Sequence, residues 1–128
     1  MIHSTTSFSE ELNKPHGHTL NIEFLVEGSL NNRDYLIDLT ELEKIITGVA
    51  ESYNRALVIS RENIIKEKHL DKIFSKIVYV ERGDATLENI AIEISKKIFD
   101  ALRDHGSIDK VILRIYEGNR YIAEVEYP

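Results

Sequence analysis

The sequence predicts an α+β domain in which two long helices cover one face of a four-stranded antiparallel sheet. Residues 19–27 alternate apolar and polar side chains with the period of a half-buried strand. Two later segments repeat apolar residues at helical spacing, and residues 110–127 form two strand-like arms around Gly118-Asn119, a pattern typical of a hairpin. The expected order is therefore β-β-α-α-β-β, and 128 residues suit a single domain spanning residues 1–128.

The first half of the chain is expected to supply two strands and the first helix. Leu36-Ile37 is a short extended piece that we expect to be the second strand. The helix begins after Asp38 or Thr40 as N-cap, and Glu43, three residues beyond Thr40, completes a capping box. Its apolar stripe contains Leu42, Ile45, Ile46, Val49 and Tyr53.

The second half begins with an insert and continues with the second helix and the hairpin. We expect the insert to contain a short helix around residues 61–73, a strand at 76–80 and a turn at 82–84. The second long helix begins at Asp84 or Thr86 and ends near Gly106, because glycine suits the position that follows a helix. The end strands of such a sheet have unpaired edges that copies can join, so we expect a homo-oligomer.

Composition restricts the classes of partner and of chemistry. The formal net charge is -6 and no basic run is present, which argues against nucleic acid and anionic membranes and favours a small-molecule partner. The sequence has no cysteine, which excludes disulfides, thiolate metal ligands and a thiol nucleophile. No secretory leader and no apolar run of about 20 residues are visible, so a soluble cytoplasmic protein is the default expectation.

Three polar residues at strand ends are candidates for a binding site. His16 and His18 share the parity of the apolar residues of the first strand, so both imidazoles can approach one metal ion, although two histidines are only half of a zinc shell. Glu117 continues the inward-facing set of its strand, and its carboxylate could accept two parallel hydrogen bonds from a pterin or guanine edge. The alternatives are polar residues at a strand start, and a hairpin-end glutamate paired with Arg120 or a backbone N–H.

Four motifs in order resemble the 6-pyruvoyltetrahydropterin synthase and 6-carboxytetrahydropterin synthase family. They are Phe8 ahead of "HGH" at 16–18, "YLIDLTELEKII", "ATLENIAIEI" and "VILRIYEG". The resemblance covers nearly the whole chain and implies the tunnelling fold, with three subunits closing a barrel and two trimers stacking into a hexamer. It also implies active sites between subunits, zinc held by three histidines, a catalytic cysteine, an Asp-His pair after the first helix, and a pterin-anchoring glutamate.

The match to this family is uneven at the residues that would do chemistry. His16 and His18 correspond to two zinc ligands and Glu117 to the pterin anchor. Thr86 and Glu88 correspond to the pocket-lining Thr-x-Glu, although they would also suit a helix N-cap and first turn. The third zinc histidine falls near Leu12, the cysteine is missing, and Tyr53-Asn54 stand where the family has Asp-His.

Three functions remain compatible with these residues. The first is a protein that binds a pterin or purine-like ligand at a subunit interface without the standard catalytic apparatus. The second is a divergent metal-dependent pterin lyase, of the 6-pyruvoyl or 6-carboxytetrahydropterin synthase type or acting in queuosine biosynthesis. There Glu10 or Glu11 would complete the metal set or replace the cysteine as base. The third is a non-catalytic structural or regulatory homologue.

Overall fold

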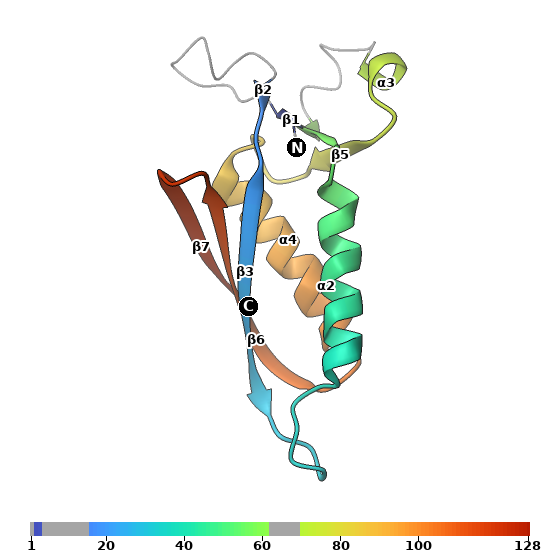
Figure 1. The fold of residues 1–128 in the computed structure, drawn as a ribbon, viewed down its shortest axis with the longest axis vertical. Coiled ribbons are helices and arrows are strands. Elements are labelled where there is room, and N and C mark those ends of the chain that lie inside the picture. Colours follow the sequence, from blue (N-terminus) through green and yellow to red (C-terminus); the bar gives the residue numbers. More distant parts are fainter. Residues whose placement is uncertain (1, 4–15, 62–69) are drawn as a thin grey trace.

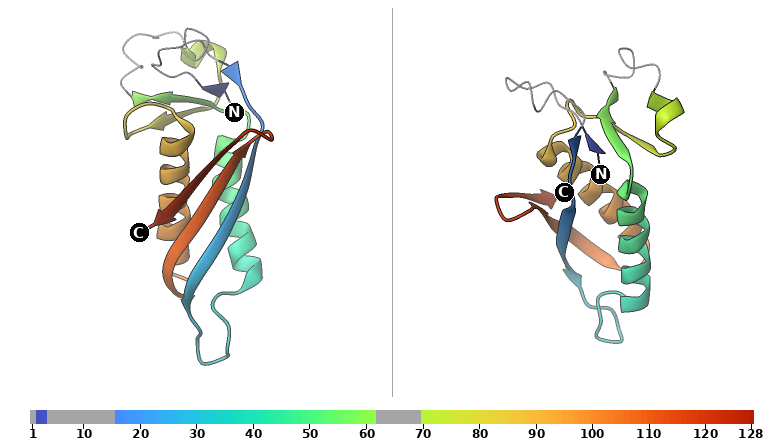
Figure 2. Two further views of the ribbon diagram at one scale, coloured as in Figure 1. Left: turned by 90° about the vertical axis from the view of Figure 1, so that its left-hand side faces the viewer. Right: turned by 45° about the horizontal axis from the view of Figure 1, so that its top comes forward.

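Two long helices pack on one face of an antiparallel sheet, which confirms the predicted α+β class (Figures 1 and 2). The computed structural model describes residues 2–3, 16–61 and 70–128. The helices are α2, Leu39–Tyr53, and α4, Leu87–Leu102. The sheet contains β3, Leu20–Ser29, β6, Ser107–Glu117, and β7, Tyr121–Tyr127.

The register of the main sheet brings the start of β3 beside the end of β6. Strand β6 is central and pairs antiparallel with β3 and β7. Leu20 lies opposite Glu117, and alternate residues of β3 are half-buried and exposed, as the sequence predicts. At the far end of the strand Gly28 has no room for a side chain, because an added Cβ would lie 2.0 Å from the Ser107 carbonyl oxygen. Because Leu20 lies opposite Glu117, the pairing also holds His18, two residues before Leu20, near Glu117.

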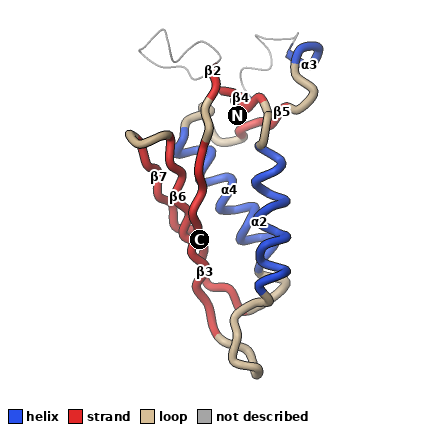
Figure 3. The backbone as a smooth tube through the Cα atoms, viewed as in Figure 1, coloured by secondary structure: helices blue, strands red, loops and turns tan. Residues whose placement is uncertain are grey.

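A second, smaller sheet lies at the end of the molecule where α2 finishes (Figure 3). Its strands are β2, His16–Gly17, β1, Ile2–His3, β4, Leu57–Ser60, and β5, Ile77–Val80, in the order β2-β1-β4-β5. β5 confirms the strand predicted at 76–80. The sequence did not reveal β4, because its four residues are all buried and carry no alternation. The short helix expected around 61–73 is described only as α3, Leu70–Ile73, and residues 62–69 lie outside the described residues.

The prediction of a second strand at Leu36-Ile37 is wrong. These residues form bends, and the main sheet has three strands in the described part of the chain instead of the four expected. The Asn31 side-chain oxygen accepts hydrogen bonds from the backbone N–H groups of Arg33 and Tyr35, at 2.8 and 3.3 Å. This local turn occupies the chain that a hairpin partner of β3 would need, so the segment leads directly into α2.

The helix starts follow the sequence signals, and one helix end does not. Asp38 is the N-cap of α2 and accepts from the backbone N–H groups of Thr40 and Glu41, so Thr40 is not the cap. Thr86 is the N-cap of α4. α4 ends with Arg103 as C-cap, earlier than the predicted end at Gly106. Gly106 instead packs against the Leu36 carbonyl oxygen, which would lie 2.5 Å from an added Cβ.

The core lies between α4 and the main sheet. The inward residues of α4 are almost completely buried, and they face the buried alternate residues of β6. The set comprises Ile90, Ala91, Ile94, Ile98, Leu102, Val111, Leu113 and Ile115. None of the helices described is long and apolar enough to cross a membrane.

Candidate functional site

His18 and Glu117 form a pair at the end of the main sheet. The His18 Nδ1 atom lies 3.2 Å from Glu117 Oε1, and the two side chains are 22% and 25% exposed. The pair exists because the β3–β6 register places Leu20 opposite Glu117, and His18 lies only two residues before Leu20. Glu117 therefore contacts His18, and the alternative pairing of Glu117 with Arg120 is wrong.

Two grooves meet at His18. We call the first the hairpin-side groove; it measures about 610 Å³ and lies along the β6–β7 turn, lined by Gly17, His18, Thr19, Glu117, Gly118, Asn119, Arg120 and Tyr121. The second, the helix-side groove, measures about 420 Å³ and lies between β3 and the helices. Its polar lining includes His18, Thr47, Glu51, Tyr53 and Asn54. A ligand at His18 therefore has the hairpin on one side and the end of α2 on the other.

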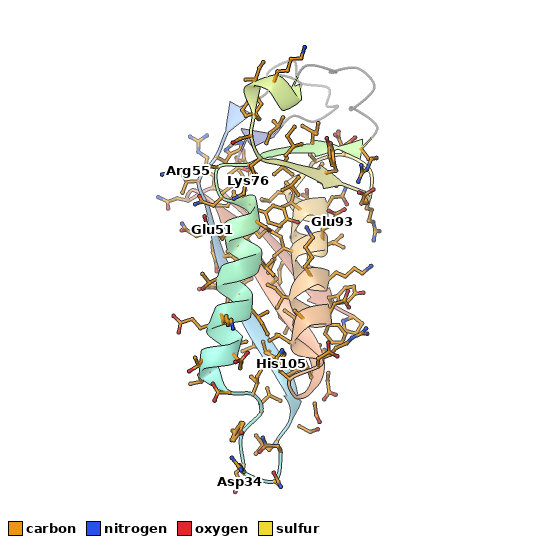
Figure 4. All side chains as sticks on the ribbon, turned by 90° about the vertical axis from the view of Figure 1, so that its right-hand side faces the viewer. Asp34, Glu51, Arg55, Lys76, Glu93 and His105 are labelled. Carbon is orange, nitrogen blue, oxygen red and sulfur yellow. The ribbon has the colours of Figure 1, made fainter. Side chains whose placement is uncertain are left out.

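The helix-side groove is bordered by the residues that replace the expected Asp-His pair. Asn54 Nδ2 donates to Glu51 Oε1 at 3.3 Å, so this amide orients a carboxylate that the sequence reasoning did not single out. Lys76 Nζ donates to the Glu51 and Asn54 carbonyl oxygens and so closes the C-terminal end of α2. Figure 4 shows Glu51, Arg55 and Lys76 together at this end, far from His105.

Tyr53 is buried and is held by a lysine of the neighbouring helix. Lys97 Nζ donates to the Tyr53 hydroxyl oxygen at 2.8 Å and lies 4.6 Å from the ring centroid. Burial raises the pKa of the Tyr53 phenol above its usual 10.0, although Lys97 opposes the rise. The phenol therefore stays protonated at neutral pH and links α2 to α4.

We expect Tyr53→Phe to lower the free energy of unfolding by about 0.5–1.5 kcal/mol at neutral pH, because one hydrogen bond is lost. A raised pKa in the folded state stabilises the fold below pH 10.0, and this contribution is lost as the pH rises through the folded-state pKa. The difference between wild type and variant in urea unfolding should therefore shrink above pH 10.0. A difference that grows with pH would contradict this assignment.

Thr86 and Glu88 do not line either groove that contains His18. Thr86 Oγ1 accepts from the Asn89 backbone N–H at 3.2 Å, and Glu88 is exposed in the first turn of α4. Within one chain these residues therefore serve the helix start. Their ligand-binding role stays a prediction.

The described donors alone do not fit a zinc centre. No three His, Cys, Asp or Glu side chains gather to hold a metal in the part of the chain that the structure describes. For His16 the structure gives the backbone, in β2, and the positions of Glu10, Glu11 and Leu12 lie outside the described residues. A metal role for His16 and His18 stays a prediction.

A third hollow lies on the opposite, uncovered face of the main sheet. It measures about 390 Å³ and is lined by Glu23, Phe24, Leu25, Ile112 and Arg114. Its charges are already engaged, since Arg114 contacts both Glu23 and Glu124 and Tyr116 donates to Glu23. The His18 grooves are therefore the better candidate site.

The fold and the site together define an α+β protein of the tunnelling-fold class, with a histidine–glutamate pair at the end of its long sheet. All of the chain, residues 1–128, matches the family described as 6-pyruvoyl tetrahydropterin synthase. The chain belongs to this family, which confirms the resemblance found in the sequence.

Curated relatives and solved structures agree with this assignment. The chain is 30% identical over 118 residues to a dihydroneopterin monophosphate aldolase of Pyrococcus furiosus, covering 92% of this chain and 83% of the relative. It is 26% identical to a putative 6-carboxy-5,6,7,8-tetrahydropterin synthase of Pyrococcus horikoshii, covering 94% and 79%.

The similar solved structures support the fold alone, because their sequence identity is low. A Plasmodium vivax 6-pyruvoyltetrahydropterin synthase superposes with a TM-score of 0.72 at 14% identity, covering 98% of this chain and 88% of that one. That structure carries a substitution of a glutamate described as a catalytic residue. The Plasmodium falciparum synthase gives the same TM-score and the same coverage.

Proposed function

We propose that this protein binds a dihydropterin at the His18–Glu117 pair and cleaves a carbon–carbon bond of the ring's side chain, as an aldolase-type lyase. The observation that carries the proposal is the half-buried Glu117 carboxylate at the mouth of a groove. The name of the Pyrococcus furiosus relative supports the reaction class and a phosphorylated dihydropterin as substrate.

Glu117 has the chemistry that a pterin ring requires. Its Oε1 atom faces His18, while Oε2 accepts no hydrogen bond from the described part of the chain. The amino group and the adjacent ring N–H of a pterin offer two parallel donors, and a carboxylate accepts such a pair with charge assistance. Binding would exchange the His18 contact for these two hydrogen bonds, leaving His18 beside the ring.

The cleavage itself needs a base on the side-chain hydroxyl. The base takes the proton of the hydroxyl on the second side-chain carbon, a carbonyl forms at that carbon, and the bond between the first and second side-chain carbons breaks, so that the outer fragment leaves as an aldehyde. The electron pair of this bond passes into the C=N system of the dihydropterin ring, and a proton then returns to the ring's side-chain carbon. We assign the base to Glu10 or Glu11, because a carboxylate can take the proton and the sequence has no cysteine to do so.

A zinc ion would need ligands beyond those that the described residues supply. His16 and His18 would supply two ligands, and Glu10 or Glu11 could supply a third instead of acting as base. Since the described donors do not complete a shell, the proposed cleavage assigns no step to a metal.

We further propose that the site lies between subunits of a homo-oligomer, a trimer or a hexamer. In the described sheet β3 and β7 each pair only with β6, so each leaves one edge open to another copy. The hairpin-side groove lies at the end of this sheet and would be closed by a neighbour.

Binding without turnover is the second candidate function. Tyr53 and Asn54 occupy the positions of the family's Asp-His pair, and the Tyr53 hydroxyl is committed to Lys97. If this pair is indispensable, the protein would bind a pterin or purine-like ligand and leave it unchanged.

Turnover by the wild-type protein, together with ligand affinity in a matched pair of variants, distinguishes these functions. We expect the purified protein to convert 7,8-dihydroneopterin or its monophosphate to a 6-hydroxymethyl product, detected by chromatography and fluorescence. Glu117→Gln should weaken ligand affinity in calorimetry by at least about 10²-fold, because the amide turns a donor toward ring donors. Glu43→Gln, at an exposed position of α2, is the control. Unchanged affinity in Glu117→Gln would overturn the proposed site, and binding without product would favour the second function.

A further inference from the structure

Arg120 is a cation of the hairpin-side groove that the proposed reaction does not yet use. It follows the Gly118-Asn119 turn and lines the groove together with His18 and Glu117. Its side chain is exposed, and no hydrogen bond or ion pair joins it to any residue in the ranges 2–3, 16–61 and 70–128. Arg61 and Arg114, by contrast, are paired with Glu81 and Glu124.

The distribution of charge makes the two grooves different for an anion. No lysine or arginine lines the helix-side groove, so that groove has no cation to offset the repulsion between its Glu51 carboxylate and a phosphate. The hairpin-side groove offers the Arg120 guanidinium, together with the hydroxyl of Thr19 and the amide of Asn119. In a chain of net charge -6, the Arg120 guanidinium places a positive charge beside the proposed ring anchor.

We propose that Arg120 binds the phosphate of a phosphorylated dihydropterin and makes the site selective for the phosphorylated over the unphosphorylated substrate. This inference rests on the proposed function and names its specificity residue. The ring would be fixed at Glu117 on β6 and the phosphate at Arg120, on the far side of the same turn. A guanidinium presents paired N–H donors in the geometry of two phosphate oxygens, which lysine does not reproduce.

The role assigned to Arg120 predicts a change of selectivity and not a general loss of activity. We expect Arg120→Gln to lower kcat/KM for the dihydroneopterin monophosphate by about 10- to 100-fold, the loss of one or two charge-assisted hydrogen bonds. The value for unphosphorylated dihydroneopterin should stay unchanged. Arg120→Lys should recover only part of the preference. Lys44→Gln, an exposed cation on α2, controls for the change in net charge.

Inorganic phosphate separates phosphate recognition from recognition of the whole substrate. It should inhibit the wild-type protein competitively against the monophosphate and inhibit Arg120→Gln less. Equal losses on both substrates, or an unchanged ratio between them, would overturn the role of Arg120. If wild type turns over neither substrate, the proposed function fails instead. The same ratio, measured as affinities by calorimetry, then decides whether Arg120 selects phosphate.

Discussion

Replacing the proposed catalytic base should lower kcat by about 10²- to 10⁴-fold, and we expect this loss in one of the two variants Glu10→Gln and Glu11→Gln. The proposed reaction needs a single base, so the other variant should stay near wild type. Glutamine keeps the size of the side chain and its acceptor oxygen but cannot take a proton. Single-turnover measurements with saturating substrate would report the loss in the chemical step.

Glu51→Gln is the matched comparison, because the Glu51 carboxylate lines the helix-side groove together with His18. Its Oε1 atom already accepts from Asn54 Nδ2, and we expect its substitution to change kcat little. A large loss in Glu51→Gln, with both N-terminal variants active, would move the base to the end of α2. Loss in none of the three would exclude a carboxylate base from these positions.

Leu113→Ala should lower the free energy of unfolding by about 2–5 kcal/mol. Leu113 is fully buried on the central strand β6, where it lies opposite Phe24 on β3 and Val125 on β7. The smaller side chain loses buried apolar area and leaves a cavity, because two neighbouring strands and α4 hold the surrounding core in place. Urea unfolding at one fixed protein concentration measures the change, since association between copies would otherwise alter the apparent stability.

Leu39→Ala is the control for this core substitution. Leu39 is 76% exposed at the first turn of α2, and alanine suits a helix at least as well as leucine. We expect its midpoint in urea to match wild type. A comparable loss in both variants would mean that Leu113 is no more important to stability than a surface residue.

The sequence predicted the elements whose side chains repeat with a clear period. The alternation from Leu20 to Val26 gave β3, and Thr86 marked the start of α4. β4 has no period, because it is buried on both faces, and Leu36-Ile37 has strand-like residues but is redirected by the side chain of Asn31. Local composition could decide neither case, since burial and a side-chain hydrogen bond overrode it.

The sequence predicted which residues belong to the candidate site, but it could not predict which of them contact each other. The parity of His18 and Glu117 along their strands indicated that both face inward, and both are half-buried. That they meet depends on the β3–β6 register, which pairs Leu20 with Glu117, 97 residues further along the chain. Glu51 and Arg120 enter the grooves only because a helix end and a hairpin turn pack beside that pair.

By itself the sequence determined the α+β class, the family and the residue types available for chemistry, because periodicity, motif order and the lack of cysteine are local properties. Only the tertiary structure decided that Glu117 pairs with His18 rather than with Arg120. The reason is strand pairing: backbone hydrogen bonds between β3 and β6 fix which distant side chains face each other, and among the described residues this leaves Arg120 lining the groove without a carboxylate partner.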